Sequence, residues 1–127
     1  MYPSDLKYGK EHEWVRVEGD VATIGISHFA QHQLGEVVYV DLPSEGDSVS
    51  TGEAFGEIES VKSVSELYLP FDGEVIKVNS SLADLPETVN EDPYGEGWMI
   101  QVRLADPAQL DTLLSAKDYE AFLSEEA

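Results

Sequence analysis

Residues 53–69 read EAFGEIESVKSVSELYL, two strand-like runs that meet at a short segment around Lys62. Lys62 is the only cationic side chain in this stretch, which also contains four glutamates. The apolar and β-branched residues on both sides favour β-strands, so the lysine is expected at the tip of a β-hairpin. An amine in that position protrudes, and an enzyme could reach it and modify it.

A second reading of Lys62 remains open at this point. A lysine among glutamates is most often a solvated surface residue in a loose ion pair that contributes little to stability. The turn is also not predicted by local signals, because Ser60-Val61-Lys62-Ser63 contains neither glycine nor an Asn-Gly pair. The pattern alone therefore allows both a modified lysine and an ordinary surface lysine.

Other short apolar and β-branched runs surround the hairpin, and turn residues separate most of them. The strands are expected at residues 14–17, 21–26, 36–42, 53–60, 63–69, 74–79 and 98–104. Strands of this length and spacing predict a mainly β fold, an antiparallel sandwich or flattened barrel. Similar segments begin at Gly35 and Gly73, which is compatible with two related halves or with chance, since many strands that leave a glycine turn look alike.

Short helices are expected outside these strands. Ser27 to Leu34 has a serine N-cap, and Gly35 follows its end. The Asp-Pro pair at 106–107 is typical of a helix start, and Ser115 with Asp118 can cap a second C-terminal helix.

The arrangement of the remaining segments is also predicted. The two C-terminal helices, at about residues 107–125, are expected to cover one side of the sheets, whose β core spans about 13–104. Residues 80–97 are polar and interrupted by proline, so we predict a long surface loop with at most one helical turn. With 127 residues, the chain is expected to form a single domain over 1–127.

The charge narrows the classes of partner. The chain has 26 acidic and 7 basic residues and a net charge of -19, which disfavours nucleic acid and anionic membrane surfaces. Proteins with basic docking surfaces, or cationic groups, are the expected partners. The N-terminus lacks the pattern of a signal or transit peptide, and no apolar run approaches membrane-spanning length, so an intracellular protein is expected.

Composition and spacing argue against independent catalysis. The chain has no cysteine, which excludes thiolate metal sites, cysteine nucleophiles and thiol redox chemistry of its own. His28 and His32 have the i, i+4 spacing of a helical zinc pair, but no third ligand is apparent, and no metal site is predicted. No nucleophile elbow or glycine-rich phosphate loop is present. We therefore predict no catalytic residues.

An ordered series of motifs extends over nearly the whole chain, at residues 12–14, 22–26, 34–38, 46–47, 59–63, 73–75 and 97–100. This series resembles the glycine cleavage system H protein family. The flanks of the lysine separate this family from its relatives: biotin carriers usually place methionines there, and lipoyl domains of 2-oxo acid dehydrogenases usually place aspartate before it. Here the neighbours are Val61 and Ser63.

The resemblance implies a lipoyl/biotinyl-carrier-like hybrid fold, with covalent lipoate on Lys62 as N6-lipoyllysine. Such a protein is a non-catalytic carrier. It accepts the aminomethyl group of glycine from a pyridoxal-phosphate glycine decarboxylase and presents it to a tetrahydrofolate-dependent aminomethyltransferase. It is then reoxidised by dihydrolipoyl dehydrogenase. A lipoate ligase or transferase would attach the cofactor.

The resemblance also implies roles for other residues. Gly46, Glu59 and Gly73 are expected to help the lipoylating enzymes recognise the site. Glu13 and Glu66 are expected to line a sheltered acidic pocket for the cationic aminomethyl group. The alternatives are a lipoyl donor that relays lipoate to other complexes and an unmodified acidic protein-binding module. We expect a monomer in the cytoplasm, or in the mitochondrial matrix for a processed eukaryotic protein.

Overall fold

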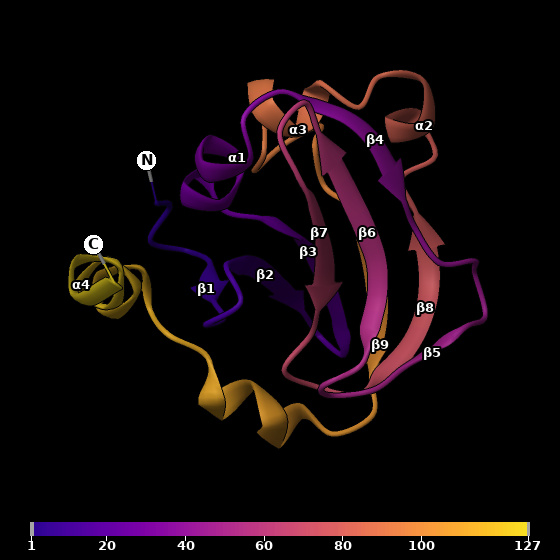
Figure 1. Cartoon of the computed structure of the whole chain (residues 1–127). Helices are drawn as coiled ribbons and strands as arrows, with labels where there is room; N and C mark the ends of the chain where they lie inside the picture. Colours follow the sequence, from indigo (N-terminus) through magenta and orange to yellow (C-terminus); the bar gives the residue numbers. More distant parts are fainter. Residues whose placement is uncertain (1, 127) are drawn as a thin grey trace.

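A computed structural model describes residues 2–126 and places their strands in two antiparallel sheets that face each other (Figure 1). The larger sheet has the order β1-β2-β3-β9-β8-β5, and the smaller has the order β4-β6-β7. The predicted mainly β sandwich is confirmed. The strands are β1 (Lys7–Tyr8), β2 (Glu13–Glu18), β3 (Val21–Ile26), β4 (Val37–Asp41), β5 (Ser48–Val49), β6 (Ala54–Ser60), β7 (Val64–Tyr68), β8 (Gly73–Val78) and β9 (Ile100–Leu104).

All seven predicted strands are present, with ends that differ by at most two residues. The chain also forms β1 and β5, which were not predicted because two residues are too short to show a periodic pattern. Both pair with a longer neighbour, Lys7 with Val15 and Ser48 with Glu74. The two similar glycine-led segments lie in different sheets, as β4 and β8.

The helices are α1 (His28–Leu34), α2 (Ser81–Asp84), α3 (Thr88–Glu91), the 3-10 helix η1 (Pro107–Thr112) and α4 (Ala116–Glu126). Three of them begin at the predicted caps. Side-chain oxygens of Ser27, Asp106 and Ser115 accept backbone N–H groups at 3.1–3.2 Å. These bonds satisfy amides that have no partner inside the helix.

The core lies between the two sheets, where apolar side chains from both inner faces meet. Removing one large aliphatic or aromatic side chain from water stabilises the fold by about 1.5–3 kcal/mol. Side chains that are at least 99% buried there include Ile24, Ile58, Phe71, Val75, Ile100 and Val102.

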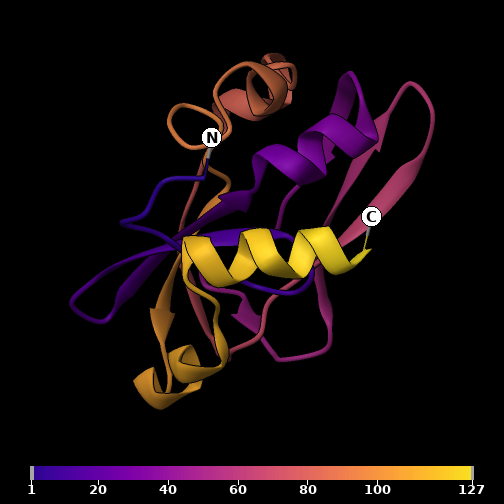
Figure 2. The same cartoon turned by 90° about the vertical axis from the view of Figure 1, so that its left-hand side faces the viewer.

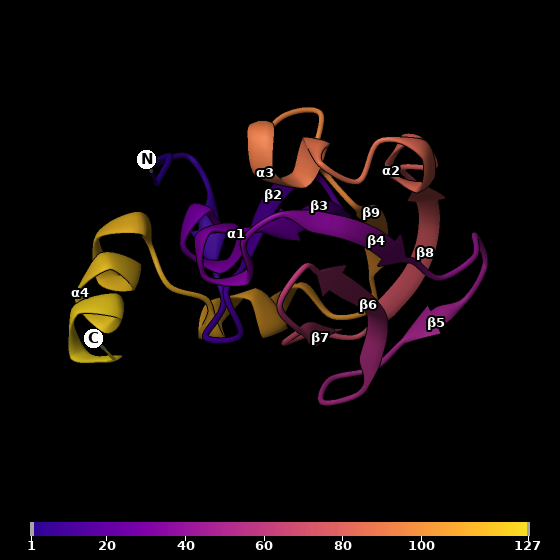
Figure 3. The ribbon, with the colours of Figure 1, turned by 45° about the horizontal axis from the view of Figure 1, so that its top comes forward.

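Residues 80–97 correct one prediction, because they are more than a surface loop. They form two helical turns, α2 and α3, which bury Leu82 and Val89 against the main core at one end of the sandwich (Figure 3). Asn90 then joins this segment to the smaller sheet, since its Oδ1 accepts the Val37 amide at 2.8 Å. Single apolar residues in a polar segment do not reveal such long-range contacts.

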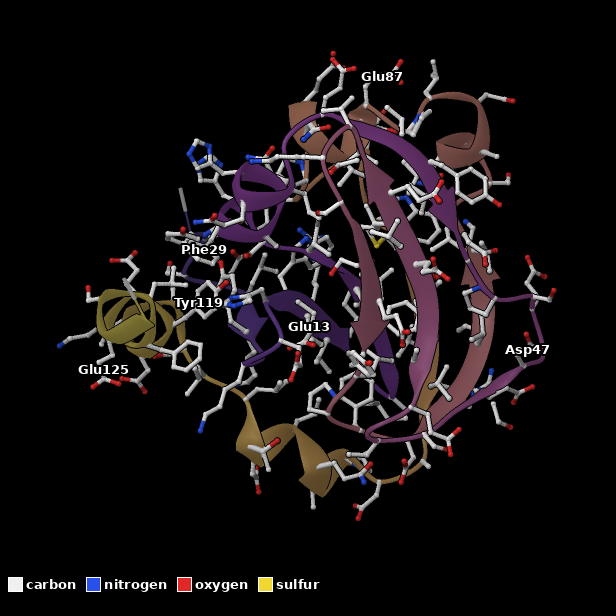
Figure 4. The ribbon with its side chains drawn as sticks, viewed as in Figure 1. Glu13, Phe29, Asp47, Glu87, Tyr119 and Glu125 are labelled. Carbon is white, nitrogen blue, oxygen red and sulfur yellow. The ribbon has the colours of Figure 1, made fainter. Side chains whose placement is uncertain are left out.

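Replacing Asn90 with alanine should destabilise the protein by about 2–3 kcal/mol, as judged by chemical denaturation. The side chain also donates to the Gly35 carbonyl at 2.7 Å, so the substitution leaves two partly buried backbone groups without a partner. Glu87→Ala is the matched control, because the Glu87 side chain is exposed on the same segment (Figure 4). Equal stability of the two variants would contradict a stabilising role for the Asn90 hydrogen bonds.

The C-terminal helix α4 matches in part the prediction that it covers one side of the sheets. It packs at one edge of the larger sheet, against Tyr8 of β1 and Trp14 of β2, and lies across the start of the chain (Figures 1 and 2). Tyr119 of α4 packs with Leu6, Tyr8 and Trp14 in a cluster separate from the main core. Two backbone bonds of 2.7 and 2.8 Å between Tyr8 and Leu114 join this part of the chain to β1. Among the described residues, no helix has the length and apolar character needed to cross a membrane.

Candidate functional site

Lys62 lies in the turn between β6 and β7, at the hairpin tip predicted from the sequence. Its side chain is exposed, and that of the preceding Val61 is 66% exposed. Among the described residues, the Lys62 ammonium has no hydrogen bond or ion pair. The structure therefore presents this amine to solvent on a short, defined turn.

The Ser60 hydroxyl explains why this turn forms without glycine. Its oxygen accepts the amides of Lys62 at 3.3 Å and Ser63 at 3.2 Å, while the Ser60 amide donates to the Ser63 carbonyl at 2.8 Å. Serine side chains commonly replace backbone partners in this way. The Val61 amide donates to the Glu36 carbonyl at 3.0 Å and thereby fastens the turn to the segment before β4. Ser60 was therefore the sequence feature that indicated this turn, and it was not used in the prediction.

The stem of Lys62 lies over Gly35, the residue that ends α1. A Cβ at Gly35 would stand 3.1 Å from Lys62 Cε. Gly35 also has φ 79° and ψ -154°, a conformation that side chains disfavour. The backbone conformation thus favours glycine here, and a Cβ at this position would also displace the Lys62 stem slightly.

Gly35→Ala should lower the free energy of unfolding by about 1–3 kcal/mol and displace the Lys62 stem. Gly19→Ala separates the two causes, because Gly19 also has a positive φ, 64°, but no atom lies within 4 Å of its added Cβ. The measurement is denaturation of both variants together with NMR shifts of the Lys62 side chain. If the NMR shifts of the Lys62 side chain were the same in Gly35→Ala and the wild type, the contact between Gly35 and the Lys62 stem would be contradicted.

A pocket of about 280 Å³, here called the α1–β7 pocket, opens beside the Lys62 turn. Its α1 wall includes Phe29, Ala30 and Leu34, and its other wall begins at Ser63, the neighbour of Lys62. Leu34 immediately precedes Gly35, against which the Lys62 stem rests. A flexible apolar arm attached to Lys62 would therefore have an apolar surface within its reach.

A second pocket, of about 450 Å³, contains Glu13 and is here called the Glu13 pocket. It is lined by Gly9 and Glu13 at one side and by Tyr68 and Leu113 at the other. A Cβ at Gly9 would overlap the Glu13 carboxyl, so the glycine makes room for it. Glu11 lines both pockets and therefore marks where they adjoin.

Glu13 is a buried carboxyl with no hydrogen-bond partner among the described residues. The residue is 4% exposed, and neither carboxyl oxygen has a hydrogen-bond partner of good geometry among the described residues. Burial, aided by the nearby charge of Glu11, raises the pKa of Glu13 to about 8, although the amide dipoles of Glu13 and Glu11 offset part of this rise. Figure 4 shows the side chain between β2 and β7. The site is thus suited to a cationic group that would compensate the carboxylate.

Glu66, the second acid expected in an acidic pocket, is placed differently. It is exposed on β7, accepts a 3.0 Å hydrogen bond from the Tyr68 hydroxyl, and lines the α1–β7 pocket. No described pocket contains both Glu13 and Glu66. Tyr68 links the two places, because it bonds Glu66 and lines the Glu13 pocket.

The three residues expected to guide lipoylating enzymes occupy separate places. Glu59 is half-buried on β6, close to the Lys62 turn. Gly46 has φ 94° in the turn before β5, beside the labelled Asp47 in Figure 4. Gly73 begins β8, where a Cβ would overlap Val102 and Arg103. The fold itself thus requires glycine at 46 and 73, and only Glu59 adjoins Lys62.

The outer face of the smaller sheet shows a pattern that sequence reasoning missed. Tyr39 and Val64 lie in register with Glu59 and are 50% and 57% exposed. Two residues further from the tip, Asp41, Glu57 and Glu66 lie in register with one another. Like charges directly opposite destabilise a sheet, so the acidic row lowers stability, while in the row nearer Lys62 the exposed Tyr39 and Val64 flank Glu59.

The histidines of α1 do not form part of a larger ligand cluster among residues 2–126. His28 and His32 stack at 6.1 Å between ring centroids, and no described group of three or more His, Asp or Glu side chains could hold a metal ion. The arrangement provides an accessible amine, an adjacent apolar pocket and a buried carboxyl. It can carry and shelter an attached group.

Comparisons with known proteins agree with this arrangement. The model of the family "Glycine cleavage H-protein" matches residues 6–126. The chain is 52% identical to the glycine cleavage system H protein of Carboxydothermus hydrogenoformans, over 99% of this chain and 97% of that protein. It is 54% identical to that of Symbiobacterium thermophilum, over 97% and 96%.

A solved structure gives the same result. The crystal structure of a glycine cleavage system H protein from Mycobacterium marinum superposes with a TM-score of 0.88 at 38% identity, covering 96% of this chain and 98% of that one. The predicted resemblance is thereby confirmed. The chain belongs to the glycine cleavage H-protein family, whose members are the non-catalytic, lipoyl-bearing aminomethyl carriers of the glycine cleavage system.

Proposed function

We propose that Lys62 is the residue that carries the lipoyl group in this chain. The observation that supports it is the exposed amine on the serine-stabilised turn, directly beside the α1–β7 pocket. The surroundings fit the group, because its acyl chain is apolar and the pocket offers Phe29, Ala30 and Leu34. The bound group would supply a reducible disulfide, a chemistry that this cysteine-free chain lacks.

The chain's own residues would shelter the aminomethyl group. The walls of the α1–β7 pocket exclude water from the arm, and Glu13 offers a carboxylate to the cationic amine. Because burial raises the pKa of Glu13 to about 8, the carboxyl is largely protonated in the chain alone, and a bound cation would favour its ionised form. Glu66 lines the α1–β7 pocket itself and would contribute a negative charge there, separately from Glu13 in the adjoining Glu13 pocket.

Recognition by a lipoate ligase or transferase would depend chiefly on the hairpin. Glu59 adjoins the turn, whereas Gly46 and Gly73 would act by shaping the fold around it. We propose all three as recognition residues, with Glu59 in direct contact with the lipoylating enzyme. An enzyme that reads the exposed turn needs few further contacts.

The surface suits brief encounters with several enzymes. The chain is a component of the glycine cleavage system, and the specific partners we propose are the pyridoxal-phosphate decarboxylase, the folate-dependent aminomethyltransferase and dihydrolipoyl dehydrogenase. The net charge of -19 would steer basic docking surfaces toward it. Tethering makes each transfer on a docked partner effectively intramolecular.

We further propose that residues 1–127 act as one lipoyl-binding domain and as a monomer. The high negative charge opposes self-association. Because the matched relatives are bacterial proteins, we propose a cytoplasmic location.

The test is peptide mass spectrometry after treatment with a lipoate ligase, lipoate and ATP. We expect one lipoyl adduct, on the peptide that contains Lys62. The other four lysines, Lys7, Lys10, Lys77 and Lys117, serve as internal controls. An adduct on one of them, or no adduct on the folded protein, would overturn the assignment.

A further inference from the structure

The hydroxyl of Tyr119 on α4 joins two segments that form the α1–β7 pocket. Tyr119 is fully buried, and its hydroxyl lies 2.8 Å from His12 Nδ1 and 2.7 Å from Ser27 Oγ. A phenol can donate to one of these atoms and accept from the other. Figure 4 shows Tyr119 extending from α4 toward the part of the molecule that contains Phe29.

His12 lies on one of the two segments that the Tyr119 hydroxyl contacts. It lines the pocket, and its φ of 71° is the only positive value among the described non-glycine residues. Such a conformation costs free energy and persists only where surrounding contacts hold it. The Ser27 amide donates to the His12 carbonyl at 2.9 Å, and the His12 ring packs 4.8 Å from that of Phe29.

Ser27, the N-cap residue of α1, lies on the other segment. Its bond with the Tyr119 hydroxyl therefore connects α4 to α1. Its Oγ accepts the Ala30 amide at 3.2 Å and so caps the helix that forms the pocket's α1 wall. Ser27 is fully buried, so its hydroxyl depends on protein partners. One buried phenol on the last helix thus bonds both the cap of α1 and the strained residue opposite.

We infer that Tyr119 is a positioning residue, through which α4 holds His12 and α1 in the geometry that shelters the arm on Lys62. The inference rests on the proposed packing of that arm in the α1–β7 pocket. Without the hydroxyl, His12 and the first turn of α1 open more often, and water reaches the aminomethyl group. The C-terminal helix is therefore part of the carrier site although it lies at the edge of the fold.

Tyr119→Phe tests the inference, with Tyr8→Phe as its matched control. The two rings stack on each other at 4.8 Å, both side chains are fully buried, and both changes keep the ring. The Tyr8 hydroxyl, however, donates at 2.8 Å to the Pro3 carbonyl, which belongs to neither pocket wall. The pair separates a general loss of stability from a change at the pocket.

Two measurements are made on both variants. In the unmodified chain, amide exchange at Ser27 and Gln31 should be about fivefold faster in Tyr119→Phe and unchanged in Tyr8→Phe. In the lipoylated chain loaded with the aminomethyl group, free of partner enzymes, the group should be lost about fivefold faster from Tyr119→Phe alone. Together these results would support the inference.

The opposite outcomes are distinct. If the wild-type chain loses the group as fast as denatured protein does, the pocket assignment fails and this inference fails with it. If the wild-type chain retains the group and Tyr119→Phe retains it equally well, only the inference fails. Unchanged exchange at Ser27 and Gln31 in Tyr119→Phe, or equal changes in both variants, would also overturn it.

Discussion

Lys62→Arg should abolish lipoylation and all glycine-dependent aminomethyl transfer through this chain, while the protein remains folded. Arginine keeps the positive charge, but its guanidinium stays protonated and cannot become the acylated amine. The Lys62 side chain is exposed and its ammonium has no partner among the described residues, so the free energy of unfolding should change by less than about 0.5 kcal/mol. The effect is therefore purely chemical.

The measurements are intact mass after ligase treatment and glycine decarboxylation with the partner enzymes. Lys117→Arg is the control, because Lys117 is an exposed lysine on α4, away from the hairpin. That variant should be lipoylated and active like the wild type. Lipoyl addition to Lys62→Arg at the wild-type level would show that another lysine carries the group.

Glu13→Gln should stabilise the unmodified protein at neutral and alkaline pH. The pKa of Glu13 is about 8 in the folded protein, against an ordinary value of 4.5. Between these pH values the folded state retains a proton that the unfolded state has released, so stability falls as pH rises from about 4.5 to about 8. Glutamine never ionises, and the variant escapes this loss.

The expected gain is roughly 2–4 kcal/mol near pH 8 and close to zero near pH 4.5, measured by denaturation across this range. Glu125→Gln is the control. This substitution removes the same formal charge, but from a side chain that is exposed on α4 (Figure 4). A Glu13→Gln profile parallel to that of the wild type would show that the Glu13 carboxyl is already ionised at neutral pH.

The same substitution should shorten the retention of the aminomethyl group. A neutral amide cannot balance the cationic amine, so the group would be lost sooner from the loaded chain in isolation. Gaining stability while losing function is the usual result of removing a strained group from a site. If retention were unchanged in both Glu13→Gln and Glu66→Gln, the acidic shelter would have no support.

Features that depend on neighbouring residues could be predicted from the sequence. The caps at Ser27, Asp106 and Ser115 each act on an amide at most three residues away, and all were predicted. The strands show their periodicity locally, so their ends differ by at most two residues. The hairpin around Lys62 belongs to this class in part, because its two strands were evident but the Ser60 hydroxyl that closes it was not.

Features that depend on distant residues could not be predicted. Residues 80–97 look polar and loop-like, yet Asn90 bonds the backbone 53 residues earlier. The apolar side chains of α4, Tyr119, Phe122 and Leu123, do not by themselves say which surface the helix covers. Tyr119 reaches His12 across 107 residues of sequence.

The acidic residues of the site, Glu13 and Glu66, show most clearly the difference between what the sequence determines and what the tertiary structure determines. The sequence alone determined that the chain is a mainly β carrier with an acidic surface and a lysine between two strands, since periodicity, composition and motif order are local properties. Only the tertiary structure decided that Glu13 is buried without a partner, that Glu66 is exposed beside a different pocket, and that α4 reaches the site. Burial and pKa follow from which distant segments pack around a group, and that packing is set by the whole chain.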